Sequence, residues 1–131
     1  MWKAISFLIV LLLAGMLAAC GGAAEPTPTP APAPTLDPEL ARGKRVFEAN
    51  CGACHSLAPD TVLVGPSLAG IAQRGATRVD GLDARGYLYT SIMRPGDYLV
   101  DGFQDLMPST LAKSLSGEDM DAVVAYLMAQ Q

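Results

Sequence analysis

The feature that most constrains this chain is a pair of cysteines three residues apart with a histidine directly after the second, Cys51-Gly52-Ala53-Cys54-His55. On one turn of helix, side chains at positions i, i+3 and i+4 lie on the same face. Two thiols placed in this way can bond the two vinyl groups of a haem while the imidazole reaches its iron. The motif therefore predicts one covalent haem c, held by Cys51 and Cys54, with His55 as an axial ligand of the iron.

Zinc binding and thiol redox chemistry are the other uses of such residues. A structural zinc site takes four Cys or His ligands, but the chain has one histidine and three cysteines, and Cys20 has a different predicted use. A thioredoxin-like pair accompanies a parallel-sheet pattern with a preceding strand, and the residues before Cys51 show no such pattern. Both alternatives are therefore disfavoured.

Residues 1–19 have the features of an export signal peptide. One charge, Lys3, precedes an apolar run that is shorter than a membrane span. The run ends in Leu17-Ala18-Ala19-Cys20, which resembles the bacterial lipobox, whose cysteine is diacylated and becomes the mature N-terminus. We therefore expect lipidation of Cys20 and a lipid-anchored protein at the extracytoplasmic face of a bacterial membrane. An uncleaved signal anchor is the alternative.

Residues 20–35 form a predicted linker between the lipidated cysteine and a folded domain. Proline occupies every second position from Pro26 to Pro34, with Thr and Ala between. This spacing favours an extended polyproline II chain and excludes a helix, and a dozen such residues would span roughly 35–40 Å. We interpret the linker as a semi-stiff tether that holds the domain off the membrane. A disordered leader is the alternative.

Residues 36–131 are long enough for one small domain, and their sequence pattern predicts an all-α fold. The first predicted helix is Pro38–Asn50, with Asp37 as its N-cap and a proline at the favoured first position. The second covers about Asp83–Met93 and stops before a proline, and the third covers about Ser116–Ala129 with a capping-box-like start. A domain this small has a marginal core by itself. We expect three main helices and long loops wrapped round one covalent haem.

The second iron ligand must come from another residue type because His55 is the only histidine. Methionine is the next natural ligand. Met120 and Met128 fall at helical positions and Met93 closes the second helix, so these three are predicted to be core residues. Met107 lies in a loop directly before a proline, which keeps the loop from becoming helix. Met107 is therefore the predicted second ligand.

Together these motifs resemble a class I c-type cytochrome. The resemblance covers nearly all of residues 36–131 and rests on the CxxCH motif, Gly65-Pro66-Ser67-Leu68, Met107-Pro108 and the closing helix with Tyr126. The stretch from Tyr87 to Pro108 resembles a smaller group of proteins within this class. It is similar to the cytochrome c domain fused to subunit II of some haem–copper oxidases, and to small haem subunits of bacterial respiratory complexes such as alternative complex III.

The resemblance implies roles for further residues. The Pro66 carbonyl would accept a hydrogen bond from Nδ1–H of His55, which fixes the tautomer and strengthens the ligand. Arg74 would approach a haem propionate, with a solvated surface arginine as the alternative. Tyr98 would line the haem or belong to the plain core. A structural contact between the first and last helices is implied at Gly43, Phe47 and Tyr126.

The chain departs from the family pattern in two ways. Members often have a tryptophan near the propionates, but the only tryptophan here is Trp2. Relatives of the mitochondrial type carry lysines round the haem edge, whereas the lysines of this domain are Lys44 and Lys113. From Cys20 onward eight basic and 13 acidic residues give a net charge of −5. A strongly basic docking face is not expected, and nucleic-acid binding has no support.

The predicted ligands imply the chemistry. A thioether opposite an imidazole favours ferrous iron and leaves no open position for a substrate. We therefore predict one-electron transfer in a respiratory or photosynthetic chain, by a membrane-tethered protein that is not itself an enzyme. The expected partner is a membrane redox complex: a quinol-oxidising complex, a terminal oxidase or a reaction centre. The protein would be its mobile carrier or its fixed subunit. The alternative class is a haem-based gas sensor or peroxidase-like protein in which Met107 leaves the iron.

Overall fold

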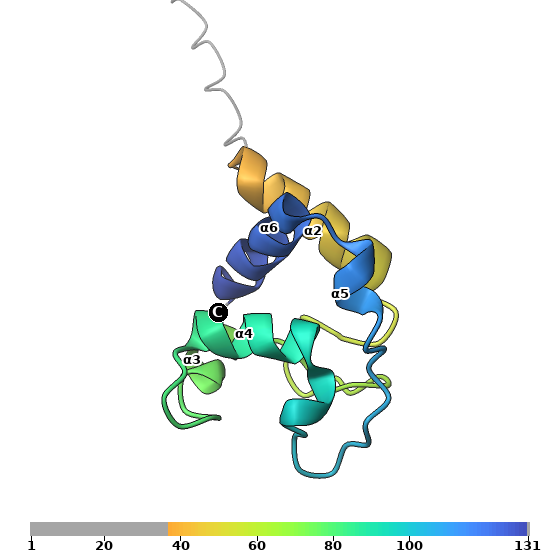
Figure 1. Ribbon diagram of the computed structural model, residues 1–131, viewed down its shortest axis with the longest axis vertical. Helices are drawn as coiled ribbons and strands as arrows, with labels where there is room; N and C mark the ends of the chain where they lie inside the picture. The colour runs from red at the N-terminus through yellow and green to blue at the C-terminus, as the bar shows by residue number, and fades with distance from the viewer. Residues whose placement is uncertain (1–36, 131) are drawn as a thin grey trace, which may run out of the picture. The chain divides into compact units, whose positions relative to one another are not determined.

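The computed structural model describes residues 37–130. The predicted signal peptide, the lipidation site Cys20 and the linker lie outside the described residues. The described chain contains five α-helices, one 3₁₀ turn and no strand, in agreement with the all-α prediction (Figure 1). None of these helices is long and apolar enough to cross a membrane. In chain order they are α2 (Pro38–Asn50), α3 (Ile71–Gly75), α4 (Ala84–Met93), η1 (Pro95–Asp97), α5 (Leu111–Ser114) and α6 (Gly117–Met128).

Helices α2 and α6 begin at the predicted caps, and α4 begins at a cap that the sequence prediction gave only as the start of the helix. At the start of α2 the Asp37 carboxylate accepts a 2.8 Å hydrogen bond from the N–H of Glu39. Asp83 caps α4 in a similar way. At the start of α6 the side chains of Ser116 and Asp119 form a reciprocal capping box. Each cap satisfies N–H groups that have no partner within the helix, which fixes where the helix begins.

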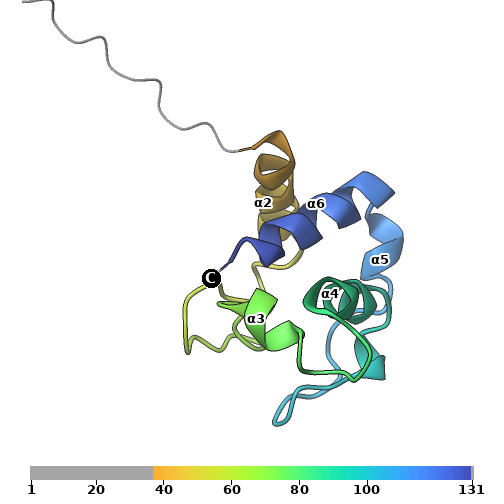
Figure 2. The same ribbon diagram turned by 90° about the vertical axis from the view of Figure 1, so that its left-hand side faces the viewer.

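Helices α2 and α6 cross in close contact, and two views agree on their placement (Figures 1 and 2). The backbones approach because residue 43 has no side chain. A Cβ at Gly43 would lie 2.0 Å from the carbonyl oxygen of Ala122 and 2.6 Å from the Cβ of Tyr126. The rings of Phe47 and Tyr126 pack beside this point with centroids 5.9 Å apart. The contact implied by the family resemblance is therefore present.

Ion pairs brace the outer edge of the same crossing. The guanidinium of Arg42 on α2 lies 2.5 Å from Glu118 and 2.8 Å from Asp119 in the first turn of α6. The hydrogen bond from Ser116, and next the one from Arg42, lower the pKa of the Asp119 carboxyl. The two carboxylates in turn raise the pKa of Arg42. Exposed pairs of this kind contribute little individually, but these link the two ends of the described chain.

The core lies where α2, α4 and α6 meet. Met120 is buried and Met128 packs against the core at its edge, as predicted. The core prediction for Met93 is wrong, because its side chain is 54% exposed. Met93 follows the buried Ile92 in the last turn of α4 and so lies off the buried face of that helix. The buried cluster consists of Val46, Phe47, Ile71, Tyr87, Leu88, Ile92, Met120, Val123, Val124 and Leu127.

Candidate functional site

The end of α2 places both cysteines and the histidine on one turn. The N–H of Cys51 donates to the carbonyl of Phe47 at 2.8 Å, so the helical turn continues into the motif. The Cys51 carbonyl then accepts from the N–H groups of Cys54 and His55 at 3.0 and 2.9 Å. This turn gives the three side chains the i, i+3, i+4 relation that the spacing predicts.

The His55 ring is held by the segment that follows the motif. Its Nδ1 lies 2.8 Å from the carbonyl oxygen of Pro66. A carbonyl only accepts hydrogen bonds, so this contact requires a proton on Nδ1 and leaves the lone pair on Nε2. The N–H of Gly65 donates to the Cys54 carbonyl at 2.8 Å, which ties this segment to the motif. The contact implied for Pro66 is therefore present, and it prepares Nε2 to bind a metal.

Glycine at position 65 is what allows this arrangement. A Cβ there would lie 2.4 Å from Cε1 of His55 and 2.9 Å from its Nδ1 and Nε2. Real Cβ atoms do not approach a ring so closely. The segment can pass over the imidazole only because Gly65 carries no side chain.

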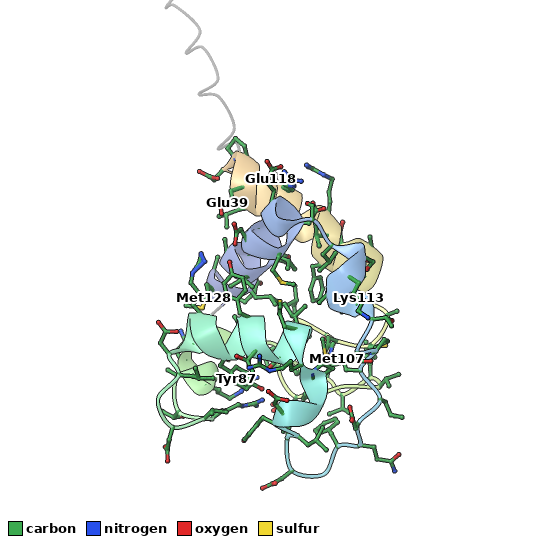
Figure 3. All side chains as sticks on the ribbon, in the orientation of Figure 1. Glu39, Tyr87, Met107, Lys113, Glu118 and Met128 are labelled. Atoms are coloured by element: carbon green, nitrogen blue, oxygen red, sulfur yellow. The ribbon has the colours of Figure 1, made fainter. Side chains whose placement is uncertain are left out.

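A single cavity brings together most of the predicted site residues. Met107 belongs to the loop between η1 and α5, and Figure 3 shows its side chain near the end of α4. The rest of the wall is largely apolar and comes mainly from the segment after the haem motif, from α4 and from the same loop, with single residues from the other elements. The predicted residues in the lining are Cys51, Cys54, His55, Pro66, Tyr98 and Met107.

The residues of this cavity suit a covalently attached haem. An imidazole with its Nε2 lone pair available and a neutral thioether are an iron ligand pair, and aromatic and aliphatic side chains suit the macrocycle. Burial, and next the charge of Cys54, raises the pKa of the Cys51 thiol to about 11. Before haem attachment, Cys51 is therefore mostly the thiol at neutral pH. Cys51 and Cys54 form no disulfide within residues 37–130.

Arg74 lies outside the lining of the cavity. Its guanidinium donates to the backbone carbonyls of Ser67, at 2.8 Å, and Ala69. The propionate role implied for Arg74 stays a prediction. Two polar residues that the sequence analysis did not assign, Arg78 and Tyr87, line the cavity instead. They lie in different segments, a loop and α4, and no spacing pattern in the sequence connects them.

This fold and site define a small all-α domain built round a covalently attached haem. A family model described as "Cytochrome c" matches residues 40–131. Because the match covers most of the chain, the protein belongs to the cytochrome c family. It is accordingly a haem c protein whose class transfers electrons rather than catalysing a reaction, and Cys51 and Cys54 have the spacing that covalent attachment requires.

Part of the chain also matches a curated cytochrome. A stretch of 39 residues, 30% of this chain, is 48% identical to a "Cytochrome c-553-like" protein of Synechocystis sp.. The match covers 36% of that protein, so it spans about a third of the relative's length. It supports the family and the haem cofactor, and it leaves the partners of this chain to be proposed.

Proposed function

We propose that this protein carries single electrons on a haem c whose iron is bound by His55 and Met107. The observation that carries the proposal is the cavity that His55 and Met107 share, together with the 2.8 Å contact that orients the His55 ring. When bound, the haem supplies an iron that alternates between the ferric and ferrous states. The chain's own part is to hold both ligands and to exclude water from the iron.

Two filled axial positions distinguish this function from gas sensing or peroxidase chemistry. An electron carrier keeps the same two ligands in both oxidation states, whereas a sensor or peroxidase must open one position for its substrate. Met107 is half-buried and packs against the core, and Leu111 donates to the Pro108 carbonyl at 3.0 Å just beyond it. These contacts hold the methionine loop in place, which favours permanent ligation by Met107.

The test compares the wild-type holoprotein with Met107→Ala. For the wild type we expect a far-red Met–Fe(III) absorption band in the ferric form and no carbon monoxide binding in the ferrous form. The variant should keep its covalent haem, lose the band and bind carbon monoxide, because only one axial ligand has been removed. Met93→Ala is the matched control, since this exposed methionine lies outside the cavity lining, and it should behave as wild type. Carbon monoxide binding by the wild type would support the sensor or peroxidase class instead.

We further propose that the domain is tethered through lipidated Cys20 and the proline linker to the extracytoplasmic face of a bacterial membrane. There it would serve a membrane redox complex of a respiratory or photosynthetic chain: a quinol-oxidising complex, a terminal oxidase or a reaction centre. The lipobox-like sequence and the alternating prolines support the tether. Two acyl chains on one cysteine hold a protein firmly at a bilayer, whereas one holds it only marginally.

The surface beside the cavity supports association with a protein partner. Val62, Leu63 and Val64 are exposed by 60%, 50% and 54%, and Leu106 on the methionine loop by 62%. Val64 and Leu106 also line the cavity, so the apolar surface reaches its edge. Val62 and Leu63 lie outside the cavity lining, and neighbouring exposed apolar residues of this kind are typical of interaction sites. The net negative charge of the chain favours a partner with basic residues round an apolar centre.

A further inference from the structure

A half-buried cation lines the haem cavity. Arg78 donates from its Nη1 to the hydroxyl of Tyr87 at 2.8 Å, and its guanidinium carbon lies 5.4 Å from the centre of the same ring. Tyr87 is itself fixed, because it is buried and packs edge-to-face on Tyr98 with centroids 5.8 Å apart. The position of the guanidinium is therefore set by the side chains around it. Figure 3 shows Tyr87 on α4, next to the α3 segment.

No carboxylate of the described residues forms an ion pair with Arg78. The four salt bridges found between residues 37 and 130 involve Arg42, Lys44 and Arg94 as cations. Asp105 lines the same cavity, but it has no hydrogen bond or ion pair with Arg78. A guanidinium offers five N–H donors, and the Tyr87 hydroxyl engages only one nitrogen. No side-chain nitrogen of the described residues is both buried and without a hydrogen-bond partner, so the free donors of Arg78 remain accessible and can pair with an anion in the cavity.

Arg74 differs from Arg78 in its partners and in its position. Its two terminal nitrogens donate to the carbonyls of Ala69 and Ser67, and it lies outside the cavity lining. These bonds tie α3 to the loop before it and engage both terminal nitrogens of Arg74, whereas only one nitrogen of Arg78 is engaged. Of the two arginines, only Arg78 has free donors at the wall of the cavity.

We infer that Arg78, fixed by Tyr87, binds a propionate carboxylate of the attached haem. The propionates are the anionic groups of this otherwise apolar cofactor, and a planar guanidinium is well suited to a carboxylate. The Tyr87 hydroxyl accepts from Arg78 and keeps its own proton, which it can donate to the same carboxylate. Arg74 then has a structural role in the α3 loop. The inference rests on covalent haem attachment by Cys51 and Cys54.

The test measures the midpoint potential of holoprotein variants, with haem content and the far-red band recorded for each. Arg78→Gln removes a positive charge beside the haem, which disfavours the ferrous state relative to the ferric state. We expect the equilibrium constant for reduction to fall about tenfold, or about 59 mV for a one-electron couple. Arg78→Lys keeps the charge and should recover most of the loss. Arg74→Gln is the matched control and should leave the potential unchanged.

Two outcomes would overturn the inference. One is an unchanged potential in Arg78→Gln with the haem attached, and the other is a loss in Arg74→Gln equal to that in Arg78→Gln. If Arg78→Gln does not fold, the variant Tyr87→Phe still tests whether Arg78 binds a propionate. It removes only the hydroxyl and should lower the equilibrium constant roughly two- to threefold, whereas no change would count against the inference. Absence of covalent haem or of the far-red band in the wild type would contradict the proposed function instead, so the two failures are distinguishable.

Discussion

At the scale of single residues, the orientation of His55 depends on an absent side chain. The Pro66 carbonyl reaches Nδ1 only because Gly65 leaves room over the ring. In Gly65→Ala the new Cβ, 2.4 Å from Cε1, must push the imidazole aside. We expect the variant to lose the His55–Pro66 hydrogen bond and about 1–3 kcal/mol of folding stability, as overpacking typically costs. The altered ligand should also shift the ferric spectrum and the midpoint potential.

Gly52→Ala is the matched control for this prediction. It makes the same change of side chain within the haem motif, but its Cβ would meet nothing closer than 3.6 Å. Thermal unfolding and the far-red band should be close to wild type in that protein. Equal effects of the two substitutions would show that the close approach at Gly65 does not control the histidine.

The residues of the site were predictable to the extent that they form local motifs. The CxxCH spacing predicts Cys51, Cys54 and His55 on one face because residues i, i+3 and i+4 share a face wherever the backbone forms a helical turn. The cavity residue Arg78 could not be predicted, because its partner Tyr87 lies in another element and the pairing depends on the loop between them. The propionate role of Arg74 is implied by its position in the family pattern, and that position does not reveal that both terminal nitrogens of its guanidinium donate to nearby carbonyls.

At the scale of secondary-structure elements, the crossing of α2 and α6 organises the described chain. Gly43→Ala would bring a Cβ to 2.0 Å from a backbone oxygen of α6, and neither backbone can move without separating the helices. We expect a loss of about 3 kcal/mol or more, at the upper end of overpacking costs. Gly117→Ala is the matched control, because a Cβ there meets nothing within 4 Å. Chemical denaturation of both holoproteins checks the difference, and equal stabilities would contradict the tight crossing.

Asp119 at the start of α6 makes the folding stability of the helix crossing depend on pH. The hydrogen bond from Ser116 and the pairing with Arg42 lower the pKa of Asp119 in the folded protein. A carboxyl with a depressed folded pKa stabilises the protein above its unfolded pKa, about 3.9, and this contribution is lost as the pH falls through the folded pKa. Asp119→Asn should therefore lower the melting temperature at neutral pH and should differ less from wild type in acid.

The control for this prediction is Asp80→Asn. The Asp80 side chain has no hydrogen bond or ion pair with any residue of the described chain, so its removal should leave the pH profile of the melting temperature unchanged. A constant difference between wild type and Asp119→Asn at every pH would show that the capping geometry matters and the charge does not.

Elements with a cap and a sustained apolar face were predictable, and single turns were not. The starts of α2, α4 and α6 follow from caps and first-turn residues that are adjacent in the sequence. Helices α3 and α5 have five and four residues, which is too short for a periodic pattern. The backbone of Gly70, with a φ of 61°, starts α3, and glycine tolerates this value without predicting it. Helices α3 and α5 both contact α4, and the sequence pattern does not reveal this packing.

At the scale of the whole molecule, the proposed tether would act together with the exposed apolar residues beside the cavity and with the net negative charge of the chain. A lipid anchor restricts the domain to the neighbourhood of the membrane, which raises its effective concentration at a membrane partner. Contacts between opposite charges then align the two proteins, and salt weakens them over a screening length of about 10 Å at 0.1 M. Association should therefore persist in gentle detergent at low ionic strength and weaken as salt is added.

Gentle detergent extraction of native membranes, followed by sizing with haem staining, tests this expectation. We expect the haem of this chain to travel with a large assembly at low salt and to separate from it at high salt. The intact mass of the extracted wild-type protein separates the two anchors. A mature chain that begins at an acylated Cys20 would support lipidation, whereas a chain that still carries residues 1–19 would show that the signal stays uncleaved as an anchor. A haem band at the mass of one small domain at every salt concentration would contradict stable association and define a mobile carrier, because a complex held by contacts between charges cannot be absent where those contacts are strongest.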